Sequence, residues 1–421
     1  MRRSKFWLMV GALCVAMGLS ATSALAAPSE VSGAQATAGT VVVGADQEPR
    51  TLNTFTNEGN LAWGSYVTIP IMASAVKYNH KGALVMDLFQ SIVLEKRAPL
   101  TVRYNIKQAA KWSNGRPVTA ADVIFTHRVV KAAPGITSRV GHEDVSTAKQ
   151  INAKSVRLVF SKPYVAYRTL FGRILPNPSV PGSPVSNDLT QFESSMRNSL
   201  PLASGPFRFA SWNRGSQLVV ERNPNYWGKR ANLQRIVFRF IPDTNTQFQA
   251  LRGGEVDIIV PQPQLQIADI KKQRNIRVQQ GLQFAWEHVD LQTGPGGHPA
   301  LRKKFVRQAI FTGINRRQIA TALYKEIAPN IPVLNNVIYK PFQPEYVAHK
   351  YQPFGFSQAK AISLLRSNGC TGGPARPGAG GTYSCPGVGQ LEFDFYSTAG
   401  NQLRELAFAI MQKQLASVGI K

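Results

Sequence analysis

Short strand patterns and helix patterns alternate along this chain from residue 40 onward, with turn residues between them. Residues 101–106 alternate apolar and polar side chains as a half-buried strand does, whereas the apolar side chains of residues 403–415 recur at helical spacing. No segment repeats at a fixed period. This order of elements predicts a mixed α/β protein. Its 421 residues are too many for one ordinary core, so we expect two or three domains.

The other elements follow from the same patterns. Strands are predicted at residues 40–43, 156–160, 207–212, 217–222, 235–241, 255–260 and 391–396. Helices are predicted after a capping box at residues 119–122, and at residues 244–252, 301–310, 315–323, 357–367 and 403–418. Residues 176–206 are rich in Pro, Ser and Asn and are predicted to form a connecting loop.

The first residues indicate export from the cytoplasm. Three basic residues precede a 14-residue apolar run at residues 6–19, and Ala24 and Ala26 form an A-x-A cleavage signal. This pattern predicts a signal peptide over residues 1–26, followed by a flexible leader over residues 27–39. A membrane anchor is the alternative, but a spanning helix needs about 20 apolar residues. Lipidation of Cys14 is disfavoured because Leu13 precedes it, where such sites have a small residue.

Cleavage after Ala26 leaves Cys370 and Cys385 as an even pair in an oxidising compartment. We expect them to form a disulfide that closes the glycine-rich segment between them and stabilises the fold by about 3 kcal/mol. Two free thiols or a metal pair are the alternatives. With only three cysteines and six histidines in the whole chain, an extensive His/Cys metal cluster is excluded, and we expect no metal and no cofactor.

The charge of the chain is strongly positive. Apolar residues make up 43% of the chain, enough for a folded core, and charged residues only 17%, yet Lys and Arg number 49 against 23 Asp and Glu. Removal of the three basic residues of the signal peptide lowers the formal net charge from +26 to +23. Such a surface favours contact with anionic lipid or cell-wall polymer. Nucleic acid is not an expected partner, because the chain is exported and carries no nucleic-acid motif.

Five segments, in this order, resemble the bacterial extracellular solute-binding proteins of family 5, the peptide- and nickel-binding receptors of ABC importers. The resemblance runs from about residue 40 to the end. Its segments are residues 100–123 (LTVRYNIKQAAKWSNGRPVTAADV), 205–212 (GPFRFASW), 221–227 (ERNPNYW), 247–258 (QFQALRGGEVDI) and 306–317 (VRQAIFTGINRR). Most of these residues have structural roles: Trp112 as a packed ring, Gly115 in a turn and Asp122 as a helix cap.

The resemblance implies a two-lobed α/β fold of the periplasmic-binding-protein type, class II. Lobe I would comprise residues 40–75 and 204–285, with residues 76–203 as an inserted subdomain, and lobe II would comprise residues 286–421. In this family the chain normally continues beyond the equivalent of Lys421 and returns to the first lobe. We therefore expect lobe II to be incomplete here.

The implied function is binding and not catalysis. The protein would capture a peptide or a similar small polar solute in a cleft between the lobes and deliver it to an ABC transporter permease in the membrane, from the periplasm or the outer face of the membrane or cell wall. Loops that follow strand ends supply the candidate ligand contacts. These are Asn57, Glu58, Asn60, Trp63, Trp286, Glu287, His288, Tyr396 and Asn401.

One departure from the oligopeptide-binding relatives affects the predicted ligand. There, an aspartate after a Tyr-Asn-Thr-Ser stretch holds the amino group of the peptide. Here the stretch begins at Tyr396 and the next residue is Gly400, so no carboxylate stands at that position. The amino group would be held by Glu58 or Glu287, or another small polar solute would be the ligand.

Two other functions are weighed against the receptor. Residues 146–149 and 357–360 both fit the S-x-x-K pattern of serine acyl enzymes. The pattern is short, it occurs twice, and neither S-D-N nor K-T-G follows, so we expect no enzyme activity. The other alternative is an adhesive protein of the cell wall or membrane surface that binds through charge and has no specific small ligand; its binding would depend steeply on salt.

Overall fold

The computed structural model describes most of the chain after residue 38. The described residues are 39–79, 83–261, 266–281, 286–336, 338–343, 345–348, 354–397 and 401–421. The predicted signal peptide and all but the last residue of the predicted leader lie outside them. Within the described ranges, every helix is too short or too polar to cross a membrane.

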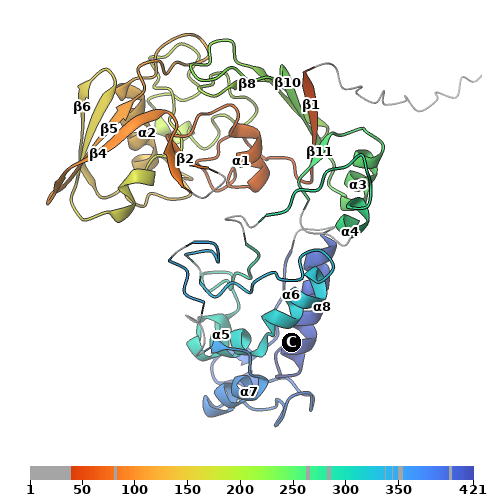
Figure 1. Ribbon diagram of the computed structural model, residues 1–421. Coiled ribbons are helices and arrows are strands. Elements are labelled where there is room, and N and C mark those ends of the chain that lie inside the picture. Colours follow the sequence, from red (N-terminus) through yellow and green to blue (C-terminus); the bar gives the residue numbers. More distant parts are fainter. Residues whose placement is uncertain are drawn as a thin grey trace, which may run out of the picture. The chain divides into compact units, whose positions relative to one another are not determined.

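A five-stranded sheet with the order β11-β1-β10-β9-β8 brings together segments from distant parts of the sequence (Figure 1). The first strand, β1 (Thr40–Ala45), is parallel both to β10 (Arg235–Phe240) and to β11 (Ile258–Ile259). The antiparallel ladder continues through β9 (Gln217–Arg222) to β8 (Phe207–Asn213). Parallel neighbours on both sides of β1 explain its run of three valines at residues 41–43.

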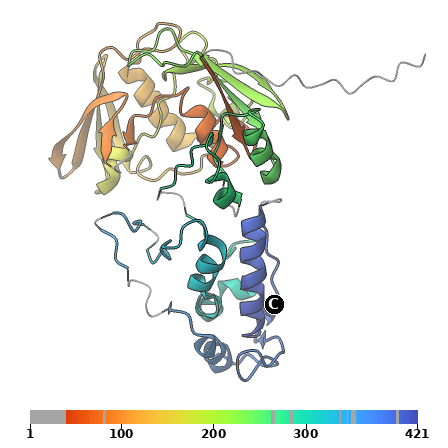
Figure 2. The ribbon, with the colours of Figure 1, turned by 45° about the vertical axis from the view of Figure 1, so that its right-hand side comes forward.

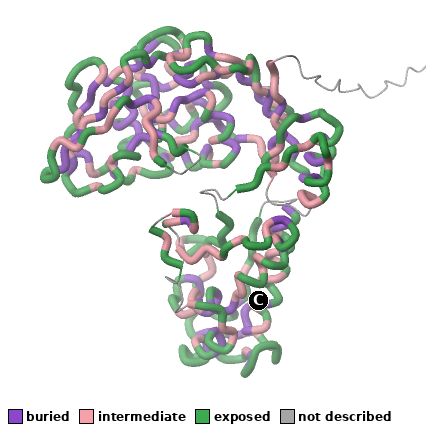
Figure 3. The backbone as a smooth tube through the Cα atoms, viewed as in Figure 1, coloured by how far each residue is buried: buried purple, intermediate pink, exposed green. Residues whose placement is uncertain are grey.

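The residues between β1 and β8 contain a second, four-stranded antiparallel sheet with the order β4-β5-β7-β6. Its strands are β4 (Phe89–Arg97), β5 (Leu100–Ile106), β6 (Val145–Asn152) and β7 (Ser155–Phe160). Helix α2 (Ala120–Ala132) packs on this sheet, and the rings of Tyr104 and Trp112 are fully buried. Figure 3 shows buried residues along these strands.

Smaller elements complete this part of the chain. They are α1 (Ala62–Thr68), β2 (Val76–Tyr78), β3 (Leu84–Met86), α3 (Thr244–Arg252), α4 (Gln266–Ile270) and the 3₁₀ helices η1 (Val165–Thr169) and η2 (Leu189–Gln191). The segment at residues 176–206 is irregular, as predicted, but it is more than a surface loop. Phe192, Met196 and Leu200 are buried in the same core as Trp63 and Phe238, because apolar side chains in an irregular segment can still fill core space.

Residues from 299 onward form a mainly helical part with its own core. Its elements are η3 (Pro299–Arg302), α5 (Lys304–Gly313), α6 (Arg316–Tyr324), α7 (Gln358–Ser367), β12 (Ser384–Cys385), β13 (Gly389–Gln390) and α8 (Gln402–Ala416). Figures 1 and 2 both show α6 beside α8, where Gln414 donates a hydrogen bond to Gln318 at 2.8 Å. The predicted disulfide between Cys370 and Cys385 is confirmed.

Two strand predictions need correction. Residues 391–396 were expected to form a strand, but they form no strand in the structure. The alternation of Leu391, Phe393 and Phe395 reflects separate contacts: Leu391 N bonds to the Tyr383 carbonyl and Phe393 N to the Lys421 carbonyl, which is too little for a continuous ladder. The predicted strand at residues 255–260 is limited to the two residues of β11, which pair with Val43 and Gly44 of β1.

Asp122 is fully buried and each of its oxygens accepts hydrogen bonds from the backbone. Oδ2 accepts from Thr119 N at 2.7 Å and so caps α2, while Oδ1 accepts from Asn177 N at 2.8 Å and from its side-chain Nδ2 at 2.7 Å. One carboxylate thus joins the start of α2 to the segment at residue 177, which confirms Asp122 as a helix cap.

Asp122→Ala should lower the free energy of unfolding by about 3 kcal/mol, since it removes the cap and leaves buried N–H donors without acceptors. Urea denaturation followed by circular dichroism measures the change. Asp243→Ala is the matched control: Asp243 caps α3 by accepting from Thr246 N at 2.8 Å, but it lies at the surface. Equal losses in the two variants would contradict the second role of Asp122.

A buried pair of histidines lies beside the four-stranded sheet. The two Nδ1 atoms of His127 and His142 are 3.0 Å apart, and His142 Nε2 lies 3.1 Å from the Leu170 carbonyl. The carbonyl must accept from Nε2–H, so in the neutral pair His142 Nδ1 accepts from His127 Nδ1–H. Burial lowers the pKa of each ring to about 4, with Lys131 and the second histidine adding to the effect on His127.

The native protein should therefore lose stability as the pH falls from about 6.5 towards 4. In this window the unfolded histidines take up protons and the folded ones do not, so protons favour unfolding. We expect a drop of roughly 5–10 °C in melting temperature across the window. The double variant His127→Gln/His142→Gln should show a much flatter profile, and His288→Asn, at an exposed position, should keep the wild-type profile. An unchanged slope in the double variant would refute the assignment.

Candidate ligand-binding site

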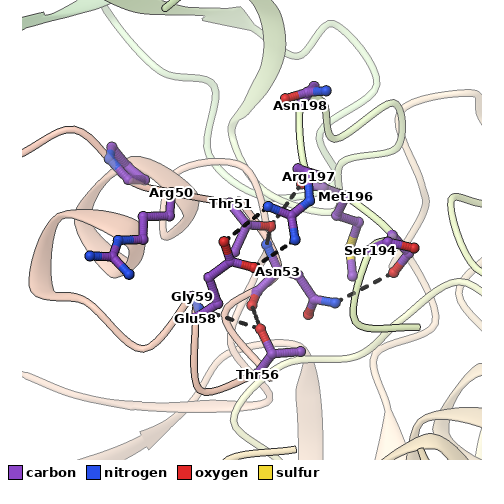
Figure 4. A network of polar contacts seen from close by, with 12 residues as sticks. Arg50, Thr51, Asn53, Thr56, Glu58, Gly59, Ser194, Met196, Arg197 and Asn198 are labelled. Carbon is purple, nitrogen blue, oxygen red and sulfur yellow. Dashed lines mark hydrogen bonds and ion pairs between the residues drawn. The ribbon is translucent and has the colours of Figure 1, made fainter. Parts of the chain in front are cut away.

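The loop after β1 is fixed to the segment at residues 192–197 by a network of polar contacts (Figure 4). Leu52 N donates to the Met196 carbonyl at 3.1 Å. The fully buried Asn53 donates from Nδ2 to the Phe192 carbonyl at 2.7 Å. These bonds join parts of the chain about 140 residues apart and give the loop one defined conformation.

Two backbone features make this loop tight. A Cβ at residue 59 would lie 2.0 Å from the Asn53 carbonyl oxygen, so only glycine fits there. Met196 has φ +56° and is the one non-glycine residue with positive φ in the described part of the chain. This conformation costs roughly 1 kcal/mol or more, and the hydrogen bond from Leu52 to its carbonyl helps to offset it.

Within this network, Glu58 makes a bidentate ion pair with Arg197 (Figure 4). The contacts are 2.7 Å from Nη2 to Oε2 and 2.9 Å from Nη1 to Oε1. The carboxylate raises the pKa of the Arg197 guanidinium. Glu58 is therefore already paired, and an amino group of a ligand would have to share it with Arg197 or displace Arg197.

The other candidates near this loop differ in exposure. Asn57 and Asn60 are exposed, and neither side-chain amide makes a hydrogen bond to any residue that the structure describes. Trp63 is 4% exposed; its ring packs in the core and its Nε1 donates to Asp46. The loop thus presents two side-chain amides to solvent, whereas Trp63 is part of the hydrophobic core.

Trp286 is 40% exposed and lies in a cluster of aromatic and cationic groups. Its ring centroid is 4.3 Å from that of His288, and the Lys340 ammonium lies 4.7 Å from the Trp286 centroid. Lys340 is 6% exposed and burial lowers its pKa. Apart from this contact with the ring, its ammonium has no hydrogen bond or ion pair with the described residues.

Glu287, the next residue along the chain, forms a bidentate ion pair with Arg404. Arg404 donates from Nε to Oε2 at 3.1 Å and from Nη2 to Oε1 at 3.0 Å, which ties residue 287 to the first turn of α8. Tyr324 also belongs to this group, and its pKa is raised mainly by burial and further by Glu287. Like Glu58, Glu287 is occupied by a guanidinium.

The last two candidates, Asn401 and Tyr396, differ in burial. Asn401 is 8% exposed and caps α8, accepting from Arg404 N at 3.1 Å. Tyr396 is 86% exposed. Gly400 lies outside the described residues.

The structure thus brings Trp286, Glu287 and His288 together with the start of α8, and Glu58 together with Arg197. Sequence reasoning missed the cations of these contacts, Arg197, Arg404 and Lys340. No local pattern marks them, because each meets its partner across a large separation in the chain; Arg197 and Glu58, for example, are 139 residues apart.

Both S-x-x-K serines have structural contacts. Ser146 Oγ donates to the Val159 carbonyl at 3.0 Å across the β6–β7 pair. Ser357 caps α7, accepting from Lys360 N at 3.2 Å. Over the described residues, no group of three or more His, Cys, Asp or Glu side chains could hold a metal ion.

Comparison with known proteins agrees with the fold. Residues 84–421 match the model for bacterial extracellular solute-binding proteins, family 5 Middle. The oligopeptide-binding protein OppA of Mycobacterium tuberculosis is 27% identical over 308 residues, 71% of this chain and 51% of the relative. The oligopeptide-binding protein AppA of Bacillus subtilis is 23% identical over 441 residues, 100% of this chain and 76% of the relative. The chain thus spans about half of the length of OppA.

Among solved structures, AppA of Bacillus subtilis in complex with a nonapeptide superposes with a TM-score of 0.73 at 22% identity, covering 91% of this chain and 73% of AppA. Similarity at this level shows the two-lobed fold. The chain belongs to family 5 of the bacterial extracellular solute-binding proteins.

Proposed function

We propose that this protein is the substrate-binding component of an ABC importer, which captures a peptide or another small polar solute outside the cytoplasm and delivers it to a membrane permease. The observation that carries the proposal is the cluster around Trp286. A half-exposed indole, an imidazole and a nearly buried ammonium stand together there. Such a combination suits a ligand with both apolar surface and polar groups.

The wider structure supports this reading. Residues 42–256 and residues 300–420 contribute to different hydrophobic clusters, as separate lobes require. We propose the lobe boundary near residue 286 and the inserted subdomain at residues 76–203. OppA and AppA are described as oligopeptide-binding proteins, and the AppA structure contains a nonapeptide.

The mechanism would be selective binding. The ligand shifts the protein to a closed form only by its additional affinity for that form, and the closed form then engages the permease. Asn57 and Asn60 would supply directional hydrogen bonds, because their exposed amides are not engaged with other described residues. The positive charge of the protein favours residence at an anionic membrane or wall surface.

Native mass spectrometry of the gently purified protein tests the proposal. We expect one small ligand per chain, which denaturation releases for identification. A peptide would define an oligopeptide receptor, and a different solute would keep the receptor and change its substrate. If the protein carries no ligand and instead binds wall polymer with steep salt dependence, the adhesive function is correct and the receptor is not.

Trp286→Ala should weaken binding of the co-purified ligand by about tenfold or more without lowering the melting temperature, since it removes exposed aromatic surface. Isothermal titration measures the affinity. Phe356→Ala is the matched control, because Phe356 is an aromatic residue of similar exposure, 49%, outside the cluster. Unchanged affinity in Trp286→Ala would show that the ligand binds elsewhere.

A further inference from the structure

Arg173 has an unusual environment for a partly buried arginine. Two other partly buried arginines have full partners: Arg157 contacts Glu95 at 2.5 Å, and Arg222 donates to two backbone carbonyls. The side chain of Arg173 makes one hydrogen bond, from Nη1 to Thr54 Oγ1, and meets no carboxylate among the described residues.

An uncompensated guanidinium in this position is costly. Burial lowers the pKa of Arg173 to about 10, so the group remains charged at neutral pH although its surroundings disfavour the charge. Proteins generally pair such groups or give them several acceptors. A planar guanidinium with most of its five donors unused is suited to bind a carboxylate through two parallel hydrogen bonds.

The position of Arg173 connects it with the candidate site. Its one partner, Thr54, belongs to the loop after β1 that also carries Asn57 and Asn60. The backbone there is fixed, since residue 173 forms a β-bridge with Ser74 and Gly172 accepts from Ala75 N at 3.1 Å. The guanidinium is therefore held beside this loop by a rigid backbone.

The charged candidate groups that have no partner of opposite charge are both cations. Both candidate carboxylates, Glu58 and Glu287, are occupied by arginines, whereas Arg173 and Lys340 have no acidic partner among the described residues. A cationic group of a ligand would have to displace an arginine from Glu58 or Glu287, whereas Arg173 and Lys340 could each meet an anionic group directly. Residue 400 is a glycine, so no carboxylate is available there to bind an amino group either.

We propose, on the basis of the receptor function above, that Arg173 binds a carboxylate of the captured solute beside Thr54. The solute is therefore recognised through its acidic group. The carboxylate can come from the carboxyl terminus of a peptide or from a small organic acid, and the experiment distinguishes the two.

The test measures affinity by isothermal titration of the full chain, freed of bound solute, with three probes. These are a pool of pentapeptides without acidic side chains and with free carboxyl termini, the same pool with amidated termini, and citrate. We expect the wild type to bind the free-acid pool or citrate, and the one that binds identifies the source. Binding to the amidated pool should be at least tenfold weaker than to the free-acid pool if the source is a peptide.

Arg173→Gln should weaken binding of the preferred probe by roughly tenfold to a hundredfold, and Arg173→Lys by less, because lysine keeps the charge but not the paired geometry. Arg128→Gln is the matched control: Arg128 is exposed and donates to Asn187 Oδ1 at 2.7 Å. Without ligand, Arg173→Gln should melt at or above the wild-type temperature, since no ion pair is lost.

Three results would overturn the proposal. Equal affinity for amidated and free-acid peptides together with full affinity in Arg173→Gln would leave the receptor function standing and remove the carboxylate. A lower melting temperature of unliganded Arg173→Gln would assign Arg173 to folding. If none of the probes binds, the carboxylate proposal is wrong. A neutral solute released in native mass spectrometry would then keep the receptor, and an empty protein would reject both.

Discussion

The rest of the structure depends on the two parallel ladders of β1. This strand pairs with β10 on one side and with β11 on the other, so residue 40 is fixed beside residue 235. The chain between β1 and β8 must leave the sheet and return to it. That constraint makes the four-stranded sheet a separate layer of the chain, and it brings the irregular segment around residues 192–197 back against the loop that follows β1.

The same constraint decides whether Glu58 is available to a ligand. Because the two segments meet, Arg197 reaches Glu58 and neutralises the acidic residue of the loop. In the helical part, Arg404 on α8 does the same to Glu287. The groups that we propose for ligand binding are therefore the amides of Asn57 and Asn60, the exposed Trp286 indole, and the cations of Arg173 and Lys340.

Much of the local structure could be predicted from the sequence, for identifiable reasons. The capping box at Thr119, the apolar run of β1 and the Cys370–Cys385 disulfide all depend on neighbours in the sequence or on the oxidising compartment. The prediction of a strand at residues 391–396 was wrong, because alternation of apolar residues does not show whether a partner strand is present.

The sequence by itself determined the class of the protein, since the order of its motifs identifies a family whose fold those motifs build. It also determined which residue types stand after the strand ends. Only the tertiary structure decided which of them remain available. Trp63 lies in a core, and Glu58 and Glu287 are paired with arginines, whereas Arg173 lies beside Thr54 and meets no carboxylate in the part of the chain that the structure describes. The physical reason is that burial and charge pairing depend on contacts between residues more than a hundred positions apart, and no local pattern encodes those contacts.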